Sequence, residues 1–228
     1  MAAFENGIAL GADGLELDVR LSSDGAAVVH HDRTLDRTTT LRGPVAVRRA
    51  DELRRADVPS LTEVLARYRD ARIIIEMKLN RPELAAAVVA AVRRADAVER
   101  VCLGAFGWRV LRAARALEPH IATSAAREEV RWALYRSWCG WPVSSVAYGG
   151  YQVPEVAGRT RVVSPRFVDH AHRAGLGVQV WTVDTEEDAR RLLEWGVDAL
   201  ITDRPDRIVP VVLSSRPPET TEVTKATD

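Results

Sequence analysis

The chain has 228 residues, 46% of them hydrophobic, which is enough to bury the core of one α/β domain. Its 32 Lys and Arg balance 32 Asp and Glu, so composition gives no overall field that favours nucleic acid or an anionic membrane. The two cysteines, Cys102 and Cys139, lack metal-type spacing and predict no disulfide framework, which favours a reducing, cytoplasmic setting. No apolar run approaches the roughly 20 residues of a transmembrane segment.

The first third of the chain contains a helix pattern, two extended runs and a long irregular stretch. A helix is expected over residues 2–10, and a strand follows at Gly14–Val19. Residues 26–31 form the second extended run. The following stretch is rich in Arg and Thr and reads as loop until Ser60, which with Glu63 has the capping-box pattern of a helix start.

The rest of the chain alternates between helix and strand patterns, which is typical of parallel strands joined by right-handed helical crossovers. The chain offers seven barrel-type strands, and a closed barrel of this class uses eight. Strands are expected at 72–78, 101–106, 121–124, 143–148, 178–183 and 199–203, helices at 83–97, 108–117, 128–138, 165–174 and 185–195, and a hairpin within 154–163. Residues 211–228 are expected to form a disordered tail.

Two pairs of charged residues are candidates for a metal site. Glu16 and Asp18 alternate with apolar residues in the first strand, so both carboxylates point to one face. On an interior face they need a cation, whereas on an edge or surface strand they would simply be solvated. Glu76 and Lys78 repeat this spacing in a later strand, with an ordinary ion pair as the alternative. Because the carboxyl ends of parallel strands meet at one mouth, these groups are expected to converge there, and carboxylate ligands suit Mg²⁺ or Ca²⁺.

Histidine and tryptophan supply the remaining candidates. His30 and His31 point to opposite faces of an extended run, so at most one is expected to face the site as a general acid or base. Asp32 is placed to orient an imidazole ring or to shape the turn. Trp181 lies in the strongest strand pattern, where a tryptophan is most often a core residue. Asp203 ends the last strand and is expected to brace the mouth.

Several longer motifs occur together. They are the acidic strand and turn Gly11–Gly25, the histidine motif Val28–Thr39, Pro59–Leu65 followed by Ile75–Lys78, and Val180–Val183 followed by Gly196–Pro205. In this order and spacing they resemble the glycerophosphodiester phosphodiesterase family. The resemblance covers about residues 1–208.

The resemblance implies a TIM (β/α)₈ barrel of the PLC-like phosphodiesterase type over residues 1–210, with a small insertion at about 22–58. It implies metal-dependent hydrolysis of small-molecule glycerophosphodiesters to an alcohol and glycerol 3-phosphate. The implied site consists of Glu16, Asp18 and Glu76 as ligands of the divalent cation, His31 as one of two catalytic histidines, Lys78 at the phosphate and Trp181 beside the glycerol.

One departure from the family pattern lies at the start of the chain. The family's first strand carries His-Arg-Gly and is followed by Pro-Glu-Asn, and both precede the helix at which this chain begins. Seven strands leave an unclosed barrel with two edges. We therefore expect an N-terminally truncated sequence with impaired activity. Two alternatives remain open: a non-catalytic relative that binds a ligand or partner, and a phosphodiesterase that acts on another lipid headgroup.

Overall fold

The computed structural model describes residues 1–143 and 145–216 of the chain. Seven of the strands in this part pair with parallel neighbours, and the other three form antiparallel pairs. In chain order the strands are β1 (Gly14–Leu21), β2 (Ala27–Val29), β3 (Arg72–Met77), β4 (Val101–Gly104), β5 (Ala122–Thr123), β6 (Gly150–Pro154), β7 (Val156–Ala157), β8 (Thr160–Arg161), β9 (Gly177–Trp181) and β10 (Ala199–Leu200).

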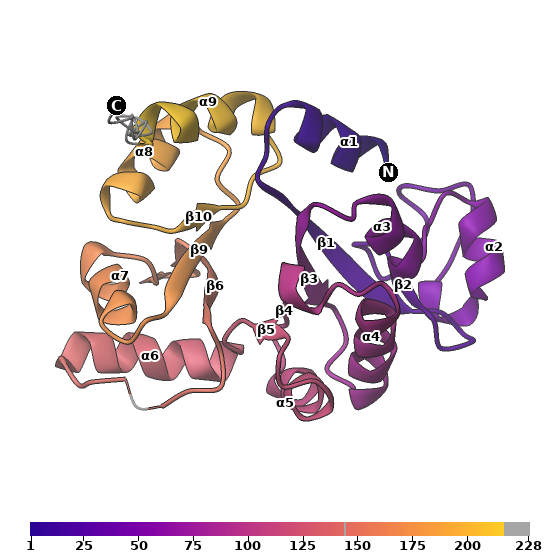
Figure 1. The fold of residues 1–228 in the computed structure, drawn as a ribbon, viewed down its shortest axis with the longest axis horizontal. Coiled ribbons are helices and arrows are strands. Elements are labelled where there is room, and N and C mark those ends of the chain that lie inside the picture. Colours follow the sequence, from indigo (N-terminus) through magenta and orange to yellow (C-terminus); the bar gives the residue numbers. More distant parts are fainter. Residues whose placement is uncertain (144, 217–228) are drawn as a thin grey trace, which may run out of the picture.

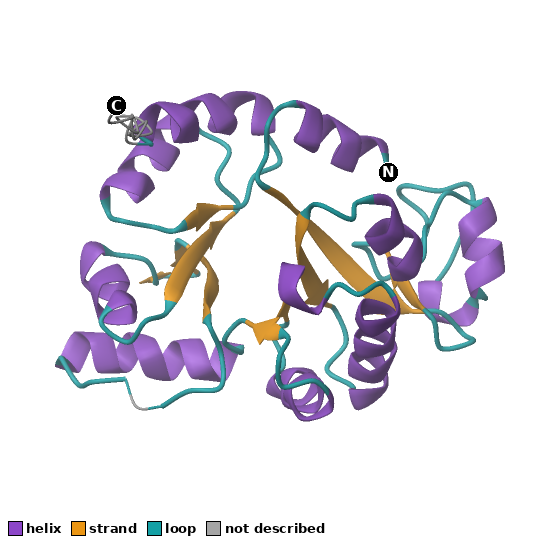
Figure 2. Ribbon diagram, viewed as in Figure 1, coloured by secondary structure: helices purple, strands orange, loops and turns teal. Residues whose placement is uncertain are grey.

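Helices surround the parallel strands (Figure 2). They are α1 (Ala2–Ala9), α2 (Ala50–Arg55), α3 (Leu61–Arg67), α4 (Pro82–Arg94), α5 (Trp108–Leu117), α6 (Arg127–Cys139), α7 (Pro165–His172), α8 (Glu186–Glu194) and α9 (Pro205–Ser215), with short 3₁₀ turns at η1 (Val45–Val47) and η2 (Val98–Arg100). The predicted capping box of α3 is confirmed, because Ser60 Oγ accepts the Glu63 N–H and the Glu63 carboxylate accepts the Ser60 N–H. None of the helices within residues 1–143 and 145–216 is both long enough and apolar enough to span a bilayer.

The parallel strands form two arcs of one open ring (Figure 1). The first sheet has the order β2-β1-β3-β4-β5 and the second β10-β9-β6. The arcs join where Ser124, just after β5, bridges Gly150 at the start of β6. Between β1 and β10 no strand pairing occurs in the described part of the chain, so the prediction of seven strands in an unclosed barrel is confirmed.

Each arc buries the strand face that points toward its helices. In β1 the apolar Leu15, Leu17 and Val19 are buried in a core with residues of α3, α4 and α5, whereas Glu16 and Asp18 between them are only half-buried. The strands β3, β6 and β9 alternate in the same way. The inner face of the ring is therefore polar and accessible at the carboxyl ends of β1 and β3.

Residues 22–58 lie beside this ring and have a small core of their own. Strand β2 pairs antiparallel with the end of β1, and Val28, Leu35 and Leu53 are buried together. Helix α2 lies within the stretch that the sequence analysis treats as loop. It is only six residues long, so its apolar periodicity is too short to be detected in the sequence.

Two sequence-based assignments are wrong. The strand expected at 143–148 is instead β6 (Gly150–Pro154), and residues 143 and 145–148 contain no strand. The tail expected from residue 211 begins too early, because 211–215 belong to α9 and Val211 is buried. Proline is the reason: Pro205 opens this helix and Pro210 lies inside it, and both read as helix breakers. Residues 217–228 lie outside the described residues.

The helices α1 and α9 lie next to each other at the open side of the ring (Figure 1). Arg216 forms an ion pair with Asp13, and Gly11 lies against the Val209 side chain. The first and last described helices thus meet over the opening between β1 and β10.

Candidate active site

Strand register brings the acidic residues of β1 and β3 together. The two strands are parallel, with Asp18 opposite Glu76, and β4 places Gly104 on the other side of Glu76. Because aligned residues of neighbouring strands share a face, Asp18, Glu76 and Gly104 form one row across the inner surface of the ring. Glu16 lies two residues before Asp18 on that face.

Lys78 follows β3 and pairs with this acidic row. Its Nζ lies 2.6 Å from Asp18 Oδ1, with 20% of the lysine side chain and 12% of the aspartate side chain exposed. The sequence left open an ion pair between Lys78 and Glu76. In the structure Lys78 forms its ion pair with Asp18. The pair keeps one positive charge among the carboxylates.

The carboxyl groups of Glu16 and Glu76 are destabilised in their charged form. Burial, together with the negative charges of Asp18, Glu76 and Asp203, raises the pKa of Glu16 from 4.5 to about 7, although Lys78 opposes this. Burial is also the main cause that raises the pKa of Glu76 to about 7. Glu76 Oε1 is buried and has no hydrogen-bond partner. Near neutral pH, a bound proton or a nearby cation therefore stabilises each of these carboxyl groups.

The side chains of this acidic row do not form a coordination shell for a metal ion. Within the described residues, no three His, Cys, Asp or Glu groups are arranged closely enough to hold one. Asp18 is instead paired with the ammonium group of Lys78. The predicted ligands Glu16, Asp18 and Glu76 are therefore neighbours in one electrostatic cluster and not a formed coordination shell.

A cleft of about 280 Å³ links the acidic cluster to the histidines, because Glu16, Asp18, His30 and His31 all line it. Both histidines border the cleft because they lie beyond the end of β2 at Val29, where strand alternation no longer applies. The expectation that at most one imidazole faces the site stays a prediction: the His30 ring is buried with Nε2 at the Thr34 carbonyl, whereas the His31 side chain is exposed. A second cleft, of about 410 Å³ beside α6, is lined by none of the predicted site residues.

The two histidines differ in their surroundings. His30 is buried, and its Nε2 contacts the Thr34 carbonyl at 3.1 Å. The side chain of His31 is 66% exposed, and its Nδ1 lies 2.8 Å from Asp32 Oδ1. Arg37 and then His31 lower the pKa of Asp32 far below its ordinary value. An ionised Asp32 therefore holds Nδ1 of His31, which leaves Nε2 for proton exchange.

Glycine at position 104 makes room for the Glu76 carboxylate. A Cβ atom at Gly104 would lie 2.6 Å from both Glu76 Oε2 and Gln152 Oε1, and 3.5 Å from Ser124 Oγ. Gln152 is held in turn by its amide N–H, which donates to Gln179 Oε1 at 3.0 Å. Gln152 of the second sheet and Glu76 of the first sheet thus both border Gly104.

Trp181 stands at the end of β9 and contacts the rim of the first sheet. Its ring meets Phe106 edge to face at 6.0 Å, and the Phe106 backbone in turn contacts Glu76 and lowers its pKa in part. The guanidinium group of Arg127 lies over the ring of Phe106, with its Cζ atom 5.1 Å from the ring centroid. Trp181 is therefore a residue of the mouth and not of the helix-facing core.

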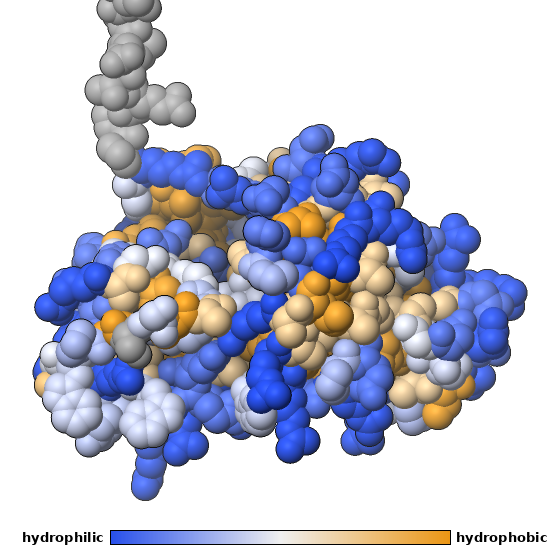
Figure 3. All heavy atoms as spheres, turned by 60° about the horizontal axis from the view of Figure 1, so that its bottom comes forward, coloured by the Kyte–Doolittle hydropathy of each residue, from blue (hydrophilic) through white to orange (hydrophobic). Residues whose placement is uncertain are grey.

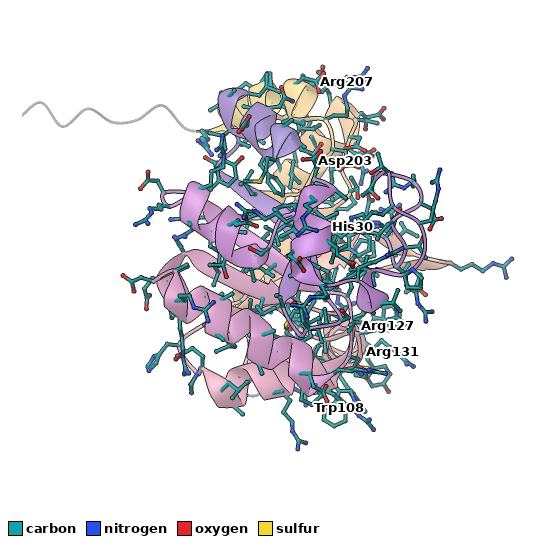
Figure 4. All side chains as sticks on the ribbon, turned by 90° about the vertical axis from the view of Figure 1, so that its right-hand side faces the viewer. His30, Trp108, Arg127, Arg131, Asp203 and Arg207 are labelled. Atoms are coloured by element: carbon teal, nitrogen blue, oxygen red, sulfur yellow. The ribbon has the colours of Figure 1, made fainter. Side chains whose placement is uncertain are left out.

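Figure 4 places Asp203, His30 and Arg127, which follow β10, β2 and β5, one below the other in the view. Asp203 also contributes to the raised pKa of Glu16. Asp203, just after the last strand, thus lies within electrostatic range of Glu16.

Four residues that support the site were not singled out from the sequence. Arg20 donates two hydrogen bonds to the His31 carbonyl, at 3.1 and 2.7 Å, and Arg37 donates to Asp32 at 2.7 Å. Gly104 and Gln152 border Glu76. The polar residue between apolar neighbours in Tyr151-Gln152-Val153 is a detectable signal for an inner face, but the strand itself was misplaced.

Comparison with known proteins agrees with this architecture. The chain is 34% identical to protein YqiK of Bacillus subtilis, over 91% of this chain and 89% of that protein. It is 29% identical to a glycerophosphodiester phosphodiesterase of Caldanaerobacter subterraneus, over 93% and 90%. Its fold matches that of a phosphodiesterase from Oleispira antarctica, solved in complex with the product sn-glycerol-3-phosphate, with a TM-score of 0.74 at 24% identity over 92% and 89%.

The family comparison covers nearly the whole of the described chain. The sequence model of the glycerophosphoryl diester phosphodiesterase family matches residues 1–207. This range includes every residue of the acidic cluster, both histidines of the cleft and Trp181. The chain belongs to the glycerophosphoryl diester phosphodiesterase family.

Proposed function

We propose that the protein hydrolyses glycerophosphodiesters to an alcohol and glycerol 3-phosphate, with a divalent cation held by Glu16, Asp18 and Glu76. The observation that carries the proposal is the acidic cluster in the cleft, next to Lys78 and His31. Relatives named glycerophosphodiester phosphodiesterase and a structural neighbour with bound sn-glycerol-3-phosphate support the same reaction.

The residues fit a hard cation. Their donors are carboxylate oxygens, which Mg²⁺ and Ca²⁺ prefer. Glu76 Oε1 is buried without a partner, and the pKa values of Glu16 and Glu76 stay raised although Lys78 lowers both, so Lys78 compensates their charges only in part. A phosphodiester anion cannot approach such a cluster unless positive charge offsets it. A cation held by Glu16, Asp18 and Glu76 would supply that charge and would offset negative charge on the phosphoryl oxygens.

The side chains of the protein have separate roles in this reaction. Lys78, paired with Asp18, presents a positive charge that can bind a phosphoryl oxygen. His31 exchanges a proton at Nε2 while Asp32, fixed by Arg37, holds Nδ1. In this scheme the imidazole either activates the nucleophile or protonates the leaving alcohol. Trp181 and Phe106 form an apolar wall at the rim, beside which the glycerol carbons can lie.

The decisive experiment measures release of glycerol 3-phosphate from glycerophosphocholine. Purified protein is assayed with Mg²⁺, with Ca²⁺ and with EDTA, and Asp18→Asn and Glu99→Gln are assayed beside it. Glu99 is an exposed carboxylate of η2, away from the cluster. We expect cation-dependent turnover that Asp18→Asn abolishes and Glu99→Gln retains.

A negative outcome is informative as well. Binding of sn-glycerol-3-phosphate without turnover by any cation would make the protein a ligand-binding relative. Turnover that persists in EDTA would refute the role of the carboxylates as cation ligands. A panel of glycerophosphodiesters and other lipid headgroup phosphodiesters then ranks the substrates.

We also propose a reducing, cytoplasmic location, which the two free thiols Cys102 and Cys139 support. Cys139 is exposed. A membrane-impermeant maleimide should therefore label it after cell lysis and leave it unlabelled in intact cells. Labelling in intact cells would refute this location.

A further inference from the structure

Four exposed aromatic side chains gather on α6 and the loop after it. Trp132, Tyr135, Trp138 and Trp141, here called the aromatic patch, are 65%, 47%, 54% and 55% exposed. The first three are spaced by three residues along the helix and so share one face. Figure 3 shows pale aromatic rings at the lower left of the surface, over α6. Large side chains exposed together are unusual for a soluble domain and indicate a binding surface.

Three of the four rings are in contact, and none of the four belongs to a core cluster. Trp132 contacts Tyr135 edge to face at 6.3 Å between centroids, and Tyr135 contacts Trp141 at 6.0 Å. The opposite face of α6 supplies the buried residues Ala133 and Leu134. The helix is therefore anchored by one face while the other presents rings to solvent.

Arginines lie on the same helix as these rings and next to it. Arg127 and Arg131 are exposed on α6, and Arg166 donates a hydrogen bond to the Trp138 carbonyl at 2.8 Å. The acids of the helix are Glu128, which is exposed, and Glu129, which forms an ion pair with Arg115. The zero net charge of the chain thus conceals a local excess of arginine beside the patch.

Arg127 connects α6 to the mouth, because its guanidinium group lies over the ring of Phe106, which contacts Trp181. In Figure 4 Arg127, Arg131 and Trp108 lie in the lower part of the view, below His30 and Asp203. Trp108 is itself exposed and carries Arg109 and Arg112 over its ring, at 5.9 and 5.3 Å. Aromatic and basic groups therefore continue from the patch toward the mouth.

We propose that the aromatic patch docks on an anionic phospholipid surface. Tryptophan and tyrosine combine an apolar ring with a polar group and suit the headgroup boundary of a bilayer, where arginine binds lipid phosphates. The exposed rings amount to roughly 330–550 Å², at about 150–250 Å² for each whole side chain. A stable dimer buries about 800 Å² on each partner, so the patch is small for a second copy of this chain.

The test is sedimentation of the full chain with vesicles. Vesicles of phosphatidylglycerol and phosphatidylcholine should bind the protein, with a blue shift of tryptophan emission, and added salt or pure phosphatidylcholine should weaken binding. The double variant Trp132→Ser with Trp138→Ser should lose at least about tenfold in affinity, as expected for two rings removed from the boundary. Arg131→Ser should lose about fivefold.

Controls separate docking from folding and from catalysis. Arg55→Ser removes an arginine of similar exposure from α2 and should bind vesicles normally. The tryptophan variant should keep the circular dichroism spectrum of the parent and its turnover of glycerophosphocholine. Absence of vesicle binding by the parent, or equal binding by the tryptophan variant, refutes the proposal. So does a dimer in solution that the tryptophan variant converts to a monomer, because the patch would then join two copies.

Discussion

Replacing Glu76 by Gln isolates the energetic cost of the acidic cluster. Gln has nearly the size of Glu but no ionisable proton. Burial raises the pKa of Glu76 from 4.5 to about 7, and the charge of Glu76 helps to raise that of Glu16 to about 7. Between pH 4.5 and 7 the folded chain therefore binds more protons at these groups than the unfolded chain. The free energy of unfolding must fall as pH rises through this window.

The magnitude follows from the size of the shift. A change from 4.5 to about 7 corresponds to roughly 3 kcal/mol at 25 °C. Because Glu16 and Glu76 repel each other, we assign about 3 kcal/mol to the pair and not to each group. This stabilising contribution is fully present below pH 4.5 and is lost by about pH 7. Glu76→Gln should therefore be about 1–3 kcal/mol more stable than the parent at pH 8 and nearly equal to it at pH 4.5.

The assay is urea unfolding in EDTA at both pH values, with Glu99→Gln as the exposed control that should match the parent throughout. Added Mg²⁺ or Ca²⁺ should then stabilise the parent at pH 8 and leave Glu76→Gln unchanged, because only the parent binds the ion. A Glu76→Gln variant that is less stable than the parent at pH 8 would refute the argument that the buried charge is uncompensated.

Three further variants test separate parts of the structure. Gly104→Ala places a methyl group 2.6 Å from Glu76 Oε2, so cation affinity measured by calorimetry should fall at least tenfold while the thermal midpoint without cation changes little. His31→Ala should lower turnover by about 10²–10⁴ without loss of stability, since this side chain is mostly exposed; unchanged turnover would exclude it from catalysis. Phe167→Ala, in the core of the second arc, should cost about 3–5 kcal/mol in urea unfolding, and a loss below 1 kcal/mol would contradict its burial.

Local sequence patterns predicted the acidic strand correctly because its physics is local. Alternation of Leu15 and Leu17 with Glu16 and Asp18 requires only a strand with one apolar face, and β1 has that face. That Glu76 lies beside Asp18 could not be derived in this way. This pairing depends on the register of two strands, and the two residues are more than fifty positions apart in the sequence.

Glycine and proline caused the errors elsewhere. Gly150 reads as a turn residue, but in β6 it allows the Gly177 backbone to approach, since a Cβ there would lie 2.5 Å from the Gly177 carbonyl oxygen. Pro210 reads as a helix breaker, yet α9 continues past it and buries Val211. In both cases tertiary packing outweighs the local preference, and a single sequence contains no sign of that packing.

The histidines show the same limit at the site. Strand alternation assigns His30 and His31 to opposite faces, but β2 ends one residue before them. The backbone then turns, and both residues border the cleft. Which of their atoms face the cleft therefore depends on where a three-residue strand stops and not on alternation alone.

The opening between β1 and β10 also bears on self-association. The second arc ends in β10, which is only two residues long and offers little backbone to pair with. In the first arc β2 pairs with Val19–Leu21 of β1, and the His30 N–H donates to the Asp18 carbonyl, so within the described residues only the start of β1, residues 14–17, faces the opening without a strand partner. Unpaired strand backbone can pair with another molecule, and charged side chains on such a segment oppose this pairing. Glu16, which we propose as a cation ligand, therefore also disfavours pairing of this segment with another copy of the chain.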